Sequence, residues 1–395
     1  MAVNEDFEHR PHPDYVRAVG FGAGSKGFPI DVEDRCYWLA LWRAPGVGAA
    51  TFRTILERVG NPRALFFDSP GARRALGLRE ATLAYLRNPD WAGVERDENW
   101  LAGEHRHLLT LHDPRYPPLL AQIADPPPLL FVHGDAEYLS RPQLAMVGSR
   151  NPTPLGAQTA FDFARSLAAA GLTVTSGLAS GIDAASHRGA LETGATVAVM
   201  GTGPDRVYPA RHRELAHHIA ANGALVSEWP TGTPVLANNF PRRNRLISGL
   251  SLGTLVVEAA AQSGSLITAR LALEQGREVL AIPGSIHNPL ARGCNALIRQ
   301  GAKLVETIED VLEEIAPLLP SVPVPCALDG LSSRSASLDA EHLEILKLVA
   351  YEPTSVDTLA VASGETAESV ASMLLILELE GYVASLPGGR YQRLK

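Results

Sequence analysis

Three arginines stand within four positions of the segment NNFPRRNRLISGLS, in a chain whose formal net charge is −8. They are Arg242, Arg243 and Arg245, and they closely follow Phe240. Guanidinium groups this close together repel one another unless a polyanion or buried carboxylates neutralise them. Phe240 can stack on a nucleobase, and Asn244 can donate and accept hydrogen bonds. The segment therefore indicates a cationic site for a phosphate-rich ligand, and single-stranded nucleic acid suits this combination best.

Loops of small residues follow the apolar runs in the middle of the chain. These loops hold Gly148, Ser149 and Arg150; Ser176, Gly177, Gly181 and Asp183; and Ser263, Gly264 and Ser265. Small residues let the backbone approach a ligand closely, and amides, hydroxyl groups and helix N termini then donate hydrogen bonds to oxyanions. Each loop alone is as often purely structural as functional. Several such loops at one edge, together with the arginines, favour a phosphate site.

A second interpretation of the arginines stays open. Buried carboxylates can neutralise an arginine and simply tie the edge of a sheet together. The candidate pairs join Arg243 or Arg245 to Asp183, Glu228 or Glu258. Such pairing is a reasonable alternative for one arginine and a weak one for all three. Asp183 stands at a predicted helix start, where it is expected to cap the helix or orient an arginine rather than act as a base.

Motifs for catalysis or for a bound cofactor are missing. A dinucleotide fold needs G-x-G-x-x-G after its first strand, but the sequence there is GSRNPTPLG. The sequence contains no Walker or H-E-x-x-H motif. Its cysteines, Cys36, Cys294 and Cys326, have no metal-ligand or disulfide spacing. We therefore expect no enzyme activity, no cofactor and no metal, and we name no catalytic residue.

Composition and local charge narrow the class of protein. Hydrophobic residues make up 46% of the 395 residues and charged residues 20%, as in a folded protein of two or three domains. Residues 141–303 hold 15 Lys and Arg against 9 Asp and Glu, whereas residues 338–395 hold 4 against 9. Neither a secretory signal nor a run of ~18 to 20 apolar residues is evident. A cytoplasmic, reduced protein without membrane insertion is the expectation.

The middle of the chain has the pattern of an α/β fold. Apolar runs such as LAMVG, LTVTSG, TVAVMG and LGTLVVEA alternate with amphipathic segments. This alternation predicts an extended Rossmann-like, doubly wound, mostly parallel sheet over residues 111–316, with a lead-in strand in PPPLLFVHGD. In such sheets ligands bind outside the carboxyl ends of the strands, which is where the small-residue loops stand.

The two flanks predict smaller domains. Residues 31–110 are expected to form an N-terminal helical domain, helix-hairpin-helix or SAM-like, around APGVGAATF. Such a hairpin either presents amides to a DNA phosphate or only packs, and packing is the commoner case. A mobile arm is expected over residues 1–30 and a Pro/Ser-rich linker over residues 317–337. Residues 338–395 have the pattern of three helices and a two-stranded hairpin, which resembles a winged helix.

The central motifs resemble those of the DNA-processing protein A family, also called Smf. The resemblance rests on GSR, SGLASGIDAASHRGAL, VYPARHREL, NNFPRRNRLISGLS, SGSLITARLALEQGREVLAIPG and GCNALIRQGA, almost without a break over residues 141–305. It implies a noncatalytic protein that binds single-stranded DNA, loads the recombinase RecA onto it during natural transformation, and works as a homodimer through the Rossmann-like domain. The family's DNA-contacting motifs carry over onto Gly148, Ser149, Arg150, Ser176, Gly177, Gly181, Asp183, Phe240, Arg243, Asn244, Arg245, Ser263, Gly264 and Ser265, and less strictly onto Arg242.

Two other functions compete with this one. Phosphoribohydrolase-like nucleotide-processing enzymes share the architecture but carry P-G-G-x-G-T-x-x-E. The nearest stretch here, SGLSLGTLVVEA, lacks the Pro-Gly-Gly, and its Glu258 comes one residue late. A transcription regulator would need a basic recognition helix, but the third helix predicted in residues 338–395 contains no Lys or Arg. We expect that module to bind protein, either another subunit or RecA, or to regulate access to the site.

Overall fold

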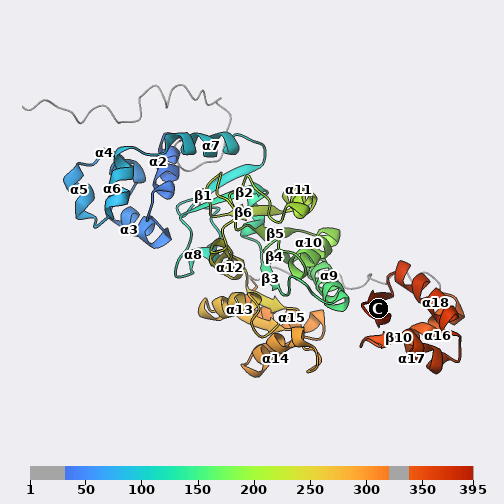
Figure 1. Ribbon diagram of the computed structural model, residues 1–395. Helices are drawn as coiled ribbons and strands as arrows, with labels where there is room; N and C mark the ends of the chain where they lie inside the picture. Colours follow the sequence, from blue (N-terminus) through green and yellow to red (C-terminus); the bar gives the residue numbers. More distant parts are fainter. Residues whose placement is uncertain (1–31, 320–337, 395) are drawn as a thin grey trace, which may run out of the picture.

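The structure is a computed structural model that describes residues 32–319 and 338–394 (Figure 1). The expected mobile arm at residues 1–30 and most of the expected linker at residues 317–337 lie outside the described residues. The described chain forms a mixed α/β domain with an N-terminal helical domain and a C-terminal winged helix, as the sequence predicted.

The N-terminal domain consists of short helices packed around aromatic side chains. They are α2 (Val32–Arg43), α3 (Ala49–Val59), α4 (Pro62–Phe67), α5 (Pro70–Ala75), α6 (Glu80–Arg87) and α7 (Trp91–Leu101). The turn between α2 and α3 passes through Gly46 at φ +79°, a backbone conformation that favours glycine. Trp38 and Phe52 stack within the core with ring centroids 5.3 Å apart. The hydrophobic cluster of this domain continues into the sheet, because it also includes Leu108, Leu129 and Phe131.

A sheet of nine strands forms the centre of the described chain, in the order β1-β2-β6-β5-β4-β3-β7-β8-β9. Its strands are β1 (Arg106–Thr110), β2 (Leu129–Gly134), β3 (Gln143–Val147), β4 (Thr173–Ser176), β5 (Thr196–Val199), β6 (Ala224–Ser227), β7 (Gly253–Val256), β8 (Glu278–Ala281) and β9 (Lys303–Leu304). Strands β3 to β9 are mutually parallel, and β1 and β2 add an antiparallel edge.

Strand β1 is the element of this sheet that the sequence interpretation missed. Its residues fall within the range predicted for the helical domain, because RHLLT is short and begins with two polar residues. Pairing with β2 makes it a strand, with Arg106 opposite His133 and Thr110 opposite Leu129. The sheet therefore begins before residue 111.

Helices cover both faces of the sheet. They are α8 (Pro118–Ala121), α9 (Pro154–Ala169), α10 (Ile182–Thr193), α11 (Arg213–Asn222), α12 (Asn239–Leu250), α13 (Ser265–Glu274), α14 (Arg292–Arg299) and α15 (Ile308–Ile315), with 3₁₀ turns η1 (Ala136–Leu139), η2 (Ala210–His212), η3 (Pro289–Ala291) and η4 (Ala316–Leu318). On β3, Leu144 and Met146 pack with α9 and α10, whereas Ala145 and Val147 pack with α12 and α13. This alternation is the one expected of a strand buried on both faces.

The strand order creates one crevice. From β3 the chain builds outward through β4, β5 and β6, and it then returns to the other side of β3 to form β7. The loops after β3 and β7 consequently diverge to opposite faces. This arrangement is the topological switch point at which open α/β sheets bind ligands.

The N-terminal domain is attached to the loop that follows β6. Trp42 Nε1 donates a hydrogen bond to the backbone oxygen of Glu228 at 2.6 Å. The buried carboxylate of Asp97 accepts from the amide and the hydroxyl of Thr231 at 2.9 and 2.7 Å, and Arg43 pairs with the same carboxylate. These contacts fix the segment that leads into α12.

The C-terminal module is a small winged helix. It contains α16 (Ala340–Leu348), α17 (Val356–Ser363) and α18 (Ala367–Leu379), and a sheet in the order β10 (Thr354–Ser355), β12 (Arg390–Arg393), β11 (Val383–Leu386). The sheet has three strands rather than the predicted two, because Thr354 and Ser355 pair with β12. Leu359, Leu374 and Leu377 belong to a core separate from that of the central domain.

Within the described residues, no single helix has the length and hydropathy to cross a membrane. Helices α17 and α18 pass that test only when taken together, and a bend of 110° separates them.

Candidate functional site

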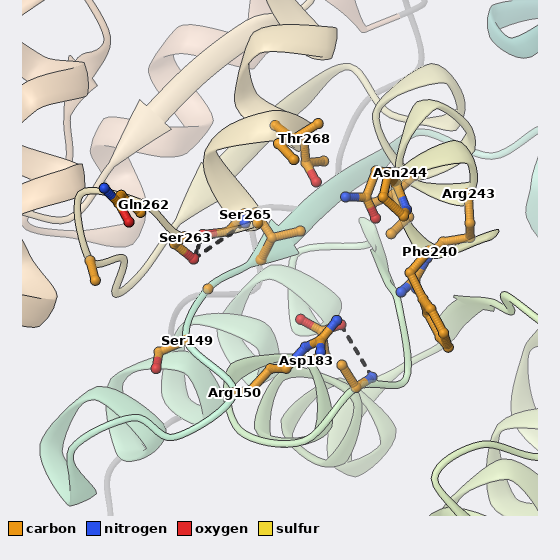
Figure 2. Close-up of a pocket in the computed structure, with 18 of the residues that line it drawn as sticks. Ser149, Arg150, Asp183, Phe240, Arg243, Asn244, Gln262, Ser263, Ser265 and Thr268 are labelled. Carbon is orange, nitrogen blue, oxygen red and sulfur yellow. Dashed lines mark hydrogen bonds between the residues drawn. The ribbon is translucent and has the colours of Figure 1, made fainter. Parts of the chain in front are cut away.

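A pocket of about 880 Å³ lies in the crevice at the carboxyl ends of the parallel strands (Figure 2). Ten of the residues predicted for the site line it, namely Gly148, Ser149, Arg150, Asp183, Phe240, Arg243, Asn244, Ser263, Gly264 and Ser265. They come from the loops after β3 and β7 and from α10, α12 and α13. The structure thus brings together segments that are up to 117 positions apart.

Ser176, Gly177 and Gly181 lie beneath the pocket and position its lining. Gly181 has φ +80°, and a Cβ atom on it would lie 2.3 Å from the backbone oxygen of Ser149. A Cβ atom on Gly177 would lie 1.8 Å from Nη1 of Arg243. Ser176 donates to the Met146 backbone oxygen at 2.7 Å. These small residues therefore make room for the lining groups.

Arg243 and Asp183 form the buried floor of the pocket. Arg243 is only 4% exposed, and its Nη1 donates to the Val199 backbone oxygen at 2.8 Å. Burial lowers the pKa of Arg243 to about 10, although the nearby Asp183 carboxylate opposes this shift. Burial raises the pKa of Asp183, against the effect of Arg243. Asp183 also accepts hydrogen bonds from two amides of the loop after β4, each at 3.2 Å.

Phe240 lies close to two guanidinium groups. The Cζ atoms of Arg150 and Arg243 are each 6.0 Å from the centroid of its ring. A Cβ atom on Gly201 would lie 2.9 Å from Phe240 Cδ1, so the glycine leaves room for the ring. An aromatic ring beside two cations suits the binding of a base together with its phosphates.

The N terminus of α13 forms the opposite wall. Ser263 and Ser265 share a hydrogen bond between their hydroxyl groups at 2.7 Å, and the Ser265 amide donates to the Ser263 hydroxyl at 3.3 Å (Figure 2). Gly264 is the N-cap, and the first turn of the helix contains no acidic residue. The positive end of the helix dipole is therefore available to an anion in the pocket.

Arg242 and Arg245 do not line the pocket. Arg245 is buried and forms an ion pair with Glu228, whose carboxylate is completely buried. Arg242 is part-exposed, lies over the ring of Trp229 at 4.7 Å from its centroid, and reaches Glu228 at 3.9 Å. Carboxylate pairing, the alternative considered for a single arginine, thus describes Arg245.

The geometry of a helix explains this division. The sequence interpretation places the arginines at a helix start, with all three guanidinium groups converging. In the structure all three lie within α12. Consecutive residues of an α-helix are about 100° apart around its axis, so positions 242, 243 and 245 cannot share one direction. Only Arg243 projects toward the pocket.

Two buried histidines fix the loop after β4. Leu178 has φ +57°, which is unusual for a residue with a side chain. Its amide donates to His187 Nε2 at 3.3 Å, and its backbone oxygen lies 2.9 Å from His212 Nδ1. His187 Nε2 therefore carries no proton, and Nδ1 donates to the Thr196 hydroxyl at 2.7 Å. Burial lowers the pKa of His187 to about 3, so the ring is neutral.

Several lining residues were not predicted for the site. Tyr208, Gln262, Ile267 and Thr268 are the most informative of these. Tyr208 stands in the strand-end loop GTGPDRVYP, so the edge argument could have found it. Ile267 and Thr268 lie on α13 within the quoted motif SGSLITARLALEQGREVLAIPG, but they were not singled out there.

Comparison with known proteins follows the same three parts of the chain. A family model described as DNA recombination-mediator protein A matches residues 107–316, one described as DprA-like N-terminal HHH domain matches residues 32–87, and one described as DprA winged helix domain matches residues 330–389. Protein Smf of Escherichia coli is 45% identical over 304 residues, which are 76% of this chain and 81% of that protein. This chain belongs to the DNA-processing protein A family.

Other members of the DNA-processing protein A family match over a similar extent. Protein Smf of Synechocystis is 34% identical over 91% of this chain and 99% of its own length. The X-ray structure of DNA processing protein A from Streptococcus pneumoniae superimposes with a TM-score of 0.62 at 35% identity, over 71% of this chain and 97% of that one. A structure from Helicobacter pylori, described in terms of a single-stranded DNA binding mode, gives a TM-score of 0.50 at 29% identity over 55% of this chain and 99% of that one.

Proposed function

We propose that the chain binds single-stranded DNA in the crevice between β3 and β7, and that it loads the recombinase RecA onto that strand without catalysing a reaction itself. Gly148, Ser149, Arg150, Asp183, Phe240, Arg243, Asn244, Ser263, Gly264 and Ser265 are the proposed contacts. The observation that carries the proposal is the pair of guanidinium groups, each 6.0 Å from the Phe240 ring, in a pocket walled by the N terminus of α13, whose first turn contains no acidic residue.

The physical fit is to an unpaired strand. A base stacked on an aromatic ring contributes ~1 to 3 kcal/mol whatever its identity, and arginines contribute a salt-dependent phosphate term. A duplex hides the faces of its bases, so it cannot use Phe240 without unstacking. The single-stranded DNA binding mode described for the Helicobacter pylori relative supports the same ligand.

The absence of catalysis is supported by the chemistry of the pocket lining. Of the described residues that line the pocket, Asp183 is the one carboxylate. It already accepts two backbone hydrogen bonds and lies near Arg243, which leaves it poorly suited to remove a proton from a ligand. Hydrolysis of a nucleoside monophosphate by the purified chain would revive the phosphoribohydrolase-like alternative.

The remaining parts of the proposal rest on family membership. They are action in natural transformation within the cytoplasm, delivery of the strand to RecA, and a homodimer formed through the Rossmann-like domain. Light scattering tests the dimer, and the rate of RecA filament growth on strands coated with single-strand binding protein tests delivery.

The decisive experiment is fluorescence anisotropy of a labelled oligothymidylate and of a duplex of equal length, titrated with the full chain. We expect tighter binding to the single strand, and weaker binding with Arg150→Ala. Removing one arginine–phosphate interaction should reduce the slope of log K against log salt by roughly 1. Equal affinity for both nucleic acids, or an unchanged single-strand affinity in a folded Arg150→Ala variant, would contradict the site.

A further inference from the structure

Tyr208 is an exposed aromatic residue at the rim of the pocket. Its side chain is 48% exposed, although the large aromatic residues of the domain cores are buried. Its ring centroid lies 5.6 Å from that of Phe240, and the two ring planes meet at 49°. A base cannot lie parallel to both rings at once. Each ring therefore offers a face to a different base.

The loop that carries Tyr208 is held in place on both sides. The Thr202 hydroxyl donates to the backbone oxygen of Arg206 at 2.6 Å, and the Gly203 amide donates to the Thr233 backbone oxygen at 3.1 Å. On the other side, the His212 amide donates to the Pro209 backbone oxygen at 3.0 Å. Tyr208 is thus presented from a braced loop, so little conformational entropy is lost when its ring is covered.

A cation stands beyond Tyr208 along the same loop. Arg211 is exposed, and its Nη2 donates to the hydroxyl of Ser180, which belongs to the loop that lines the pocket through Ala179. Among the ion pairs formed by the described residues, none involves Arg211. Its position is therefore fixed by a neutral hydroxyl while its charge stays available to a ligand.

We infer that Tyr208 and Arg211 form a second nucleotide subsite next to the one at Phe240. Tyr208 stacks on the neighbouring base of the strand, and Arg211 contacts the phosphate that follows. This inference rests on the proposed function. It implies that the bound strand runs from the N terminus of α13 past Phe240 to Tyr208 and η2.

A purely structural role for Tyr208 makes a different prediction. If the ring only packs against Phe240, any apolar side chain of similar volume preserves binding. If it stacks on a base, Tyr208→Phe preserves affinity, whereas Tyr208→Leu loses it. The leucine variant keeps the apolar contact with Phe240 but has no π face to offer.

The experiment measures the affinity of the full chain for oligothymidylates of increasing length. Tyr208→Ala and Tyr208→Leu should bind long oligomers roughly tenfold more weakly, and the loss should shrink for oligomers too short to reach past Phe240. Arg211→Gln should reduce the salt slope for long oligomers by roughly 1. Tyr351→Ala, which removes a similarly exposed tyrosine from the winged helix, is the matched control and should change nothing.

Photocross-linking gives an independent readout. Oligomers that carry 5-iodouracil at successive positions should cross-link to Tyr208 from a position adjacent to the one that links to Phe240. Wild-type affinity in Tyr208→Leu, with no cross-link at Tyr208, would overturn the second subsite even if Arg150→Ala weakens binding. If Arg150→Ala also binds normally, or the wild-type chain shows no preference for single strands, the proposed function itself fails.

Discussion

The crevice between β3 and β7 and the outer face of α18 are built in opposite ways. In the crevice, the guanidinium groups of the exposed Arg150 and the buried Arg243 each lie 6.0 Å from the centroid of an aromatic ring. On α18, which a winged helix would place in a DNA groove, Leu375, Ile376 and Leu379 are exposed, Leu379 to 80%. That helix contains Glu368 and Glu378 but neither lysine nor arginine. The winged helix, a fold that commonly binds nucleic acid, thus has an apolar and acidic surface. The central α/β domain, a fold that commonly binds cofactors, has the cationic crevice.

This contrast teaches that local placement of charge outweighs the fold that carries it. Phosphate neutralisation supplies most of nonspecific DNA affinity, so α18 would repel a duplex. The crevice collects cations even though the whole chain carries a net charge of −8. Burial of Arg243 and Asp183 also excludes water from the crevice floor, which strengthens electrostatic contacts there. Four experiments test this contrast between the crevice and the winged helix.

Reversal of charge at the crevice should have the largest effect. Arg150 is exposed and faces Phe240, so Arg150→Glu removes one cation from the bound strand and adds one repulsion. We expect the affinity for single-stranded DNA to fall roughly 100-fold at low salt. Anisotropy titration measures the loss. Arg390→Glu makes the same change on an exposed position of the winged helix and should leave that affinity unaltered. Equal losses in both variants would remove the contrast.

Crowding beneath the crevice should have the next largest effect. The Cβ atom in Gly177→Ala would lie 1.8 Å from Arg243 Nη1, so the buried guanidinium must shift away from Val199. We expect a loss of about 1 to 3 kcal/mol in the free energy of unfolding and a roughly tenfold loss of single-strand affinity. Urea unfolding and anisotropy measure the two.

Gly48→Ala is the matched control for this change, because an added Cβ atom would find nothing within 4 Å there. Because Gly48 is the N-cap of α3, this variant is a control for affinity only, and it should leave the single-strand affinity unaltered. Wild-type affinity in Gly177→Ala would show that Arg243 need not hold its observed position.

The buried histidine beneath the crevice predicts acid sensitivity. The pKa of His187 is lowered from 6.5 to about 3, chiefly by burial, with His212 and Arg243 adding to the effect. The folded state therefore binds fewer protons than the unfolded state between these values, and stability falls as pH decreases through this window. The loss should be roughly 1.4 kcal/mol per pH unit below about 6.

His187→Gln isolates this contribution. Glutamine cannot titrate, so the variant should lose less stability on acidification. It still offers an oxygen to the Leu178 amide, but it replaces a buried ring that also contacts Thr196, so the variant should be less stable at neutral pH. Burial raises the pKa of Asp183, which changes stability in the opposite direction, but both proteins share this effect. His217→Gln, at an exposed position of α11, should keep the wild-type slope. Parallel curves for wild type and His187→Gln would contradict the assignment.

The sequence predicted the strands and loops that form the crevice better than the side chains that line it. Apolar runs and the glycines after them are local features, so the parallel strands and most lining loops were identified. The pairing of Arg245 with Glu228 was only one of several open alternatives, because the two residues lie 17 positions apart and no local pattern joins them. Tyr208 stands in a strand-end loop, GTGPDRVYP, but the sequence does not indicate which residue of that loop contacts Phe240 at the rim.

Removal of the winged helix should have the smallest effect, and it tests the other half of the contrast. Residues 338–394 have a core of their own, so a chain ending at Leu319 is expected to keep the central domain intact. Since α18 offers no cation, this chain should bind single-stranded DNA within about twofold of the full chain and with the same salt slope. A tenfold loss, or duplex binding by the isolated module at physiological salt, would show that the module holds DNA. An unchanged affinity together with slower RecA filament growth would instead support a protein contact. In that case the module, with its exposed Leu375 and Leu379, is needed for delivery of the strand and not for binding it.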